Sequence, residues 1–199
     1  MKDDLNNKNL DMDNEELEDD MQVRTKTAVA ERILGLLAII GKVHQGQEPS
    51  FKSWVTNNGI NNYLSFKETE FINSVEPEEN DIVYYSWRAE ALTSLFWAVN
   101  LIEEMPALNT QFDVYSIREL AEIIGNPKAF IKSVTLRSDE DLMAIETELY
   151  NQHWRVRDAQ LFGKEMPEEL NPSVVYERRY ALSWIIGYGD DWDSVPTDT

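Results

Sequence analysis

Residues 84–99, which read YYSWRAEALTSLFWAV, decide the fold because they form the most apolar stretch of the chain. Bulky side chains fall on every face if this stretch is helical, and a helix that is apolar all round is normally surrounded by others. A proline on each side predicts a central helix over about 78–104. Arg88, Glu90 and Asn100 interrupt the apolar run, so the stretch is not a membrane span.

The rest of the chain also shows helical periodicity. Apolar residues recur at three- and four-residue steps near 23–45, which is typical of an amphipathic helix ending at Gly46. Start and stop signals predict further helices over 50–55, 65–74, 117–124, from 127, 138–162 and 172–186. No stretch alternates between apolar and polar residues as a strand does. We therefore predict an all-α, single-domain helical bundle of about eight helices.

The expected helix starts depend on a few local signals. Two serines are each followed three residues later by glutamate, which is the pattern of a capping box. The other starts depend on single capping residues. The capping boxes are Ser65 with Glu68 and Ser116 with Glu119, and the single caps are Ser50, Asn126, Ser138 and Asn171.

Composition and charge limit the class of protein. The 199 residues include no cysteine, which excludes a disulfide framework, a thiolate metal site and a cysteine nucleophile. The net charge of −19 is a poor match to nucleic acid or an anionic membrane. Residues 1–20 carry a net −7 and few large apolar side chains, so we expect a disordered acidic tail before a helical domain over 21–199. This composition favours a cytoplasmic protein.

The sequence carries no established catalytic or metal-binding signature. Phosphate-binding loops, dinucleotide fingerprints, zinc-protease and nucleophile-elbow motifs are all absent. Neither His44 nor His153 has a glutamate three residues before it, as a di-iron helical bundle requires. Adjacent acidic residues lie where helix first turns favour negative charge or on solvated faces. We therefore assign no catalytic residue, no metal ligand and no cofactor.

Charged side chains within apolar helices are more informative. They come from three expected helices, and a buried charge is tolerated only when it is paired. We therefore predict one interior polar network. It is either a structural ion cluster that fixes helix register or a pocket for a ligand or substrate. Its candidate members are Arg88, Glu90, His153, Arg157, Glu177 and Arg178.

A second candidate lies near the C-terminus, in the loop that contains Asp191, Trp192 and Asp193. Oxygen ligands of this kind suit a hard cation, but the spacing matches no metal loop. We expect Trp192 to pack back on the domain while the aspartates remain in water.

The second half of the chain resembles a bacterial family filed as domain of unknown function 4272. The resemblance covers 80–199 well and 22–75 loosely, and it leaves out the acidic tail. It implies a stand-alone bacterial domain and no particular activity. The segments that carry it are SWRAEAL from Ser86, LFWA from Leu95, LRS from Leu136, HWRVRDA from His153, LNP from Leu170, VVYERR from Val174, ALSW from Ala181, GY at Gly187 and DWD at Asp191.

Two functional hypotheses follow. The first is a non-catalytic binding protein that neutralises a basic protein partner, such as a toxin or effector, in the manner of an immunity protein; the folded part alone carries −12. The second is an enzyme or small-ligand-binding protein that uses the interior cluster. In that case Glu90 or Glu177 acts as a base, His153 as an acid or base, and Arg157 or Arg178 holds an anion.

Overall fold

A computed structural model describes residues 22–46 and 48–197 and confirms the predicted all-α class, with no strand among these residues. The acidic tail over 1–20 lies outside them. The helices are α2 Lys26–Gln45, α3 Pro49–Asn57, α4 Phe66–Asn73, α5 Glu79–Ser86, α6 Arg88–Ala98, α7 Leu120–Gly125, α8 Pro127–Ser133, α9 Asp139–Phe162 and α10 Pro172–Ile185. Short 3-10 helices span Ile60–Tyr63, Val114–Ser116 and Trp192–Ser194.

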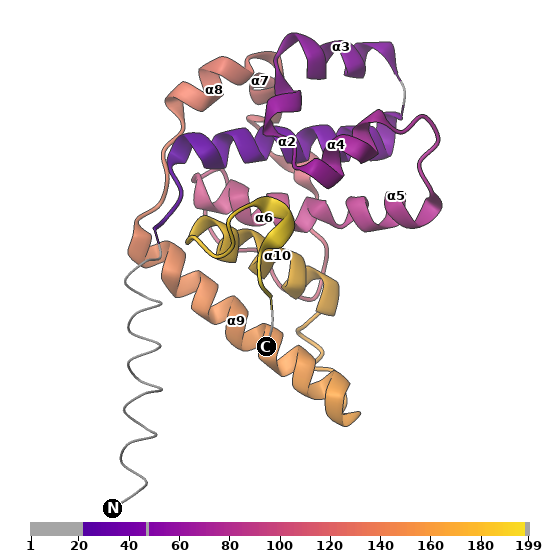
Figure 1. The fold of residues 1–199 in the computed structure, drawn as a ribbon. Helices are drawn as coiled ribbons and strands as arrows, with labels where there is room; N and C mark the ends of the chain where they lie inside the picture. Colours follow the sequence, from indigo (N-terminus) through magenta and orange to yellow (C-terminus); the bar gives the residue numbers. More distant parts are fainter. Residues whose placement is uncertain (1–21, 47, 198–199) are drawn as a thin grey trace, which may run out of the picture.

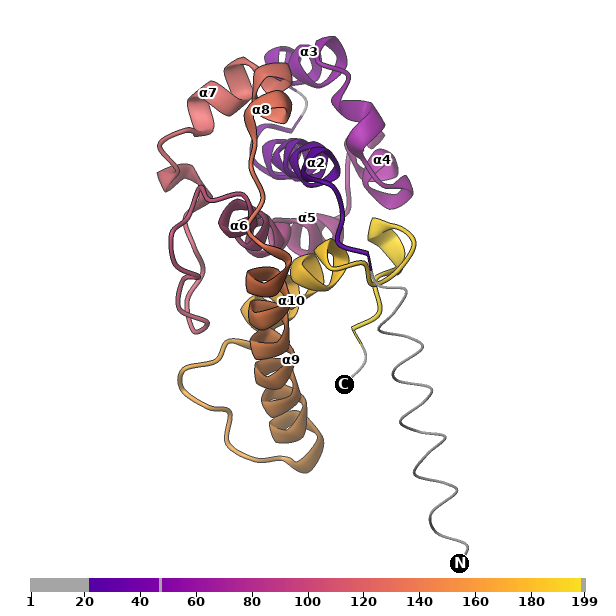
Figure 2. The ribbon, with the colours of Figure 1, turned by 90° about the vertical axis from the view of Figure 1, so that its left-hand side faces the viewer.

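Helix α6 lies at the centre of the molecule, as its apolar sequence predicts. It packs between α2 and α10, and every residue from 90 to 98 is buried. Figure 1 shows α2 above α6, with α10 and then α9 below. Seen from the side in Figure 2, the short helices α3, α4, α7 and α8 surround α2. The core is therefore a stack of helices around α6, and α9 forms the outer layer beyond α10.

The helix expected over 78–104 is instead two helices, and it ends early. The chain tightens at Trp87, whose N–H donates to the carbonyl of Tyr84 three residues before it, and α6 begins at Arg88. No glycine or proline marks this break, so tertiary contacts of the residues beside it override the local helical preference. At the other end Asn100 adopts a left-handed φ of 64°, and Leu101 N–H donates back to Phe96, which closes the helix.

Most of the expected helix starts are confirmed. Ser65 and Glu68 form the capping box of α4, while Asn126, Ser138 and Asn171 cap α8, α9 and α10. Two expected starts are wrong. Helix α3 begins at Pro49, after Glu48, so Ser50 lies inside it. Ser116 ends a 3-10 helix capped by Asp113, and α7 does not begin until Leu120.

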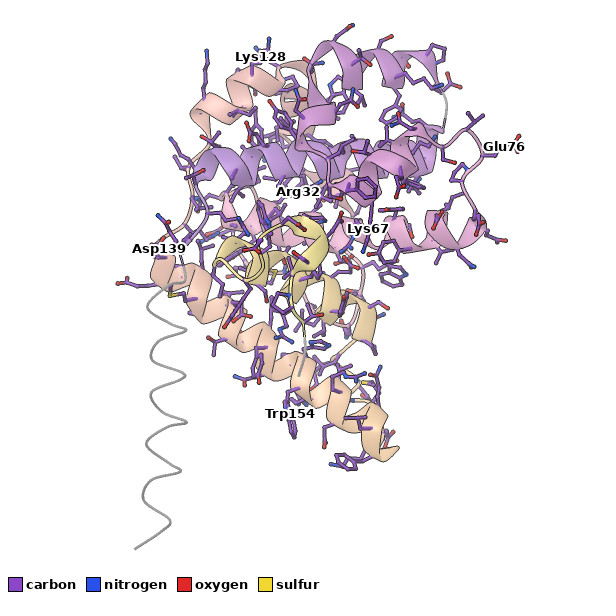
Figure 3. The ribbon with its side chains drawn as sticks, viewed as in Figure 1. Arg32, Lys67, Glu76, Lys128, Asp139 and Trp154 are labelled. Atoms are coloured by element: carbon purple, nitrogen blue, oxygen red, sulfur yellow. The ribbon has the colours of Figure 1, made fainter. Side chains whose placement is uncertain are left out.

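Helices α5 and α9 carry large apolar side chains in solvent. On α5 only Tyr85 is buried, so Ile82 and Val83 are exposed. The outer face of α9 carries exposed aromatic side chains, among them Trp154, which points away from the body in Figure 3. None of the described helices combines the length and apolar character needed to cross a bilayer.

Candidate functional site

The interior charges are organised by three consecutive residues of α10, namely Glu177, Arg178 and Arg179. All three are buried. Successive residues of an α-helix point about 100° apart, so the three side chains leave α10 in three directions. Each meets a different partner, and α10 therefore connects α6, α9 and the loop that follows α6.

Arg178 forms the most deeply buried pair, with Glu90 on α6. The guanidinium Nε and Nη2 lie 2.9 and 2.8 Å from Glu90 Oε2, and the two side chains are 0% and 1% exposed. Arg178 Nη1 also donates to the carbonyls of Pro106 and Ala107, while Glu90 Oε1 accepts the N–H of Phe112 at 2.8 Å. The pair thus satisfies backbone groups of the loop after α6 and fixes that loop against α10.

Arg88 and Glu177 form the second pair, where α5 meets α6. Arg88 Nη1 donates to Glu177 Oε2 at 2.9 Å, and its Nη2 donates to the Tyr84 hydroxyl. The guanidinium carbon also lies 5.0 and 4.7 Å from the ring centres of Tyr84 and Tyr180. Burial alone would lower the pKa of Arg88, but the Glu177 carboxylate raises it above its ordinary value. Burial raises the pKa of Glu177, and Arg88 opposes that effect.

Arg179 lies on the α9 side of α10, against a residue that sequence reasoning missed. Its Nε lies 3.8 Å from Glu146 Oε1, and Ser183 donates to the same oxygen at 2.9 Å. Arg179 Nη1 lies 2.6 Å from His153 Nδ1. Burial, then Arg179 and Arg157, lowers the pKa of His153 from 6.5 to about 4. His153 is therefore neutral near pH 7.

The structure corrects the expectation of one network in two ways. Glu90, Glu177 and His153 are all buried, but they belong to separate groups around α10, because the side chains of residues 177–179 diverge. Arg157 is exposed and bonds to Gln160, since it lies at the edge of the buried face of α9. Helical spacing could have revealed Glu146, which lies seven residues before His153 on the same face of α9.

A further buried pair, between Arg32 on α2 and Glu68 on α4, was also missed. Arg32 Nη2 lies 2.6 Å from Glu68 Oε2, and Glu68 also accepts the N–H of Ser65. The capping box explained Glu68 without a second role, so its burial was not expected. With this pair, every buried carboxylate among the described residues faces a buried arginine. The excess negative charge therefore lies on the surface.

The C-terminal loop folds back on the same core. Trp192 is 4% exposed and lies edge-on to Tyr180 and Trp184, with Arg32 4.8 Å from its ring centre. Asp191 is exposed and caps the 3-10 helix Trp192–Ser194. Asp193 is half-buried and accepts the N–H of Lys67 at the start of α4. No group of three potential metal ligands occurs in the part of the chain that the structure describes.

These features define an all-α acidic protein with arginine–carboxylate pairs buried around one C-terminal helix. The chain belongs to the family described as Domain of unknown function (DUF4272), whose model matches residues 2–195. This is the family that the resemblance indicated. The match also covers most of residues 1–20, which the resemblance left out. No curated protein and no solved structure matched the chain.

Proposed function

We propose that this protein is a non-catalytic binding protein that neutralises a basic protein partner, in the manner of a toxin-immunity protein. The observation that carries the proposal is the acidic and apolar surface of α5 and the loop before it. We call this the α5 surface and define it by Val75, Glu76, Glu78, Glu79, Asp81, Ile82 and Val83.

The apolar residues of the α5 surface lack cover from the rest of the described chain. Val75 is 75% exposed and Val83 is 53% exposed. Acidic side chains surround them, and residues 74–86 include no basic residue. Protein interfaces commonly place apolar anchors inside a polar rim. A partner that fits this surface presents an apolar patch surrounded by lysine and arginine.

The distribution of charge supports the same partner. Because the buried carboxylates face buried arginines, nearly all the excess negative charge acts on the solvent. Such a field accelerates encounter with a basic protein and repels nucleic acid. The paired interior charges serve the fold under this proposal, and they hold α10 and the central loops in place.

The test is capture of a partner by the full chain at low and high salt, with two triple variants. Glu78, Glu79 and Asp81 are replaced by lysine in the first, and Asp139, Glu140 and Asp141 in the second. Both sets lie at a helix start, so the change in net charge and the loss of favourable charge at the helix start are matched. Figure 3 shows Glu76 and Asp139 at opposite sides of the molecule.

We expect the wild-type chain to retain one basic protein, more strongly at low salt. After identification, the purified partner should bind the second variant and lose the first. Equal loss in both variants would show that only net charge matters and would reject the α5 surface. If no basic protein is retained at either salt concentration, the proposed function is wrong. A basic toxin encoded beside this gene would support it independently.

A further inference from the structure

A cleft of about 540 Å³ opens where α9, the start of α10 and the junction of α5 and α6 meet. This volume suits a small molecule. Aromatic side chains form part of its wall, and polar hydrogen-bonding side chains form another. The aromatic residues are Tyr84, Trp87 and Tyr176, and the polar ones include His153, Arg157 and Ser173.

Arg179 fixes the hydrogen-bonding role of His153 in this cleft. A guanidinium group carries only donors, so the Nδ1 atom 2.6 Å from it must accept. In a neutral ring the proton then lies on Nε2. The low pKa described above keeps the ring neutral near pH 7. His153 therefore presents an oriented N–H donor, held from behind by a buried arginine.

Arg157 gives the cleft a positive charge. Among the described residues no carboxylate pairs with it, and its bond to the Gln160 side chain is long, at 3.3 Å. Glu177 also lines the cleft, but Arg88 neutralises it at 2.9 Å. A locally positive site on a chain of net charge −19 favours an anionic ligand.

The aromatic wall does not favour a cation. Arg88 already lies 5.0 Å from the ring centre of Tyr84, so this aromatic face has its cationic partner. A cationic ligand would also lie beside Arg157. Trp87 and Tyr176 also line the cleft, and their rings offer apolar surface to an uncharged planar group.

We propose that this cleft binds a small aromatic acid, with the acid group against Arg157 and the Nε2–H of His153 and the planar group against Trp87 and Tyr176. This inference does not depend on the proposed protein partner. The site lies beside the ion pairs but uses residues that those pairs leave available.

The experiment titrates benzoate and phenyl phosphate into the full chain and follows the indole N–H resonance of Trp87 by NMR. A Trp87→Phe variant assigns that resonance. We expect a saturable shift with at least one of the two probes. If only one of them binds, that result shows whether the acid group of the ligand is a carboxylate or a phosphate. Benzamide, which has the same shape without the charge, should bind at least about tenfold more weakly.

Arg157→Gln should weaken binding by about tenfold or more, because it removes the positive charge that faces the acid group. Arg155→Gln is the matched control. Arg155 is also exposed on α9, but it pairs with Glu169 at 2.6 Å and does not line the cleft. A His153→Gln variant, whose fold is checked by circular dichroism, should also bind more weakly.

Three results would overturn the proposal. The first is no saturable shift with either acid at millimolar concentration. The second is benzamide binding as tightly as benzoate. The third is an equal loss of binding in the Arg157 and Arg155 variants, which would indicate a nonspecific effect of charge.

Discussion

The two sides of α10 use the same kind of residue in opposite ways. On one side Arg178 is fully buried, and its guanidinium contacts a carboxylate and several backbone carbonyls. On the other side Arg179 contacts His153, and beyond that ring a cleft opens to solvent. A closed group of charges maintains a fold, whereas an open one can present a donor to a ligand. The comparison predicts that stability depends mainly on the Arg178 side.

The largest effect is expected from Glu90→Gln. This change leaves the Arg178 guanidinium buried without a counter-charge, which typically costs about 3–5 kcal/mol. Urea denaturation at pH 7 measures the loss, with Glu148→Gln as the control on an exposed part of α9. If Glu90→Gln is as stable as the control, the closed side does not hold the fold together.

Arg88→Lys tests the second buried pair, whose Glu177 borders the cleft, while keeping the charge. Lysine cannot reproduce the planar fork that contacts both Glu177 and the Tyr84 hydroxyl, nor the stacking on Tyr180. We expect a loss of about 1.5–3 kcal/mol in the free energy of unfolding. Arg118→Lys, on an exposed position, should change it little. Equal stability of the two variants would mean that only the charge of Arg88 matters.

Sequence reasoning predicted the parts of this fold that depend on local chemistry. Ser65, Ser138 and Asn171 cap helices because their side chains bond to nearby backbone N–H groups. The break at Trp87 has no local sequence signal. It coincides with contacts that Arg88 makes to residues distant in sequence. Asn100 did carry a signal, since asparagine tolerates the left-handed conformation that ends α6.

The sequence predicted that charged side chains are buried in the helices, but it did not predict which of them form pairs. Apolar neighbours revealed that Glu90, Glu177 and Arg178 are buried, since each lies within an apolar helical run. Which carboxylate each arginine meets depends on how helices distant in sequence pack together. Arg157 was placed wrongly because one helical turn after His153 already reaches the edge of the buried face of α9.

His153 makes the open side sensitive to acid. Its pKa of about 4 in the folded protein lies below the unfolded value of 6.5. As the pH falls below 6.5, the imidazole is therefore protonated in the unfolded chain before it is protonated in the folded protein. Arg179 and Tyr176 face the ring from α10, and Arg157 lies beside it on α9. The contribution of His153 to stability is thus complete above pH 6.5.

That contribution falls as the pH drops from 6.5 to 4, by up to about 1.4 kcal/mol per pH unit. Urea denaturation across this range measures the slope, and His153→Gln should flatten it relative to wild type. Carboxylates titrate in both proteins, so the difference between the two slopes isolates His153. Identical slopes would show that the ring is protonated equally in the folded and unfolded states.

The smallest effect on stability is expected from Arg157→Gln, at the rim of the open side. The side chain is exposed and lacks a carboxylate partner among the described residues, so the change should stay within about 0.5 kcal/mol. The pKa of His153 should nevertheless rise above about 4, because one of its two positive neighbours is removed. NMR titration of the imidazole measures this shift, with Arg155→Gln as the control. An unchanged pKa would show that the charge of Arg157 does not act on the His153 ring. The contrast drawn between the open and the closed side of α10 would then lose this support.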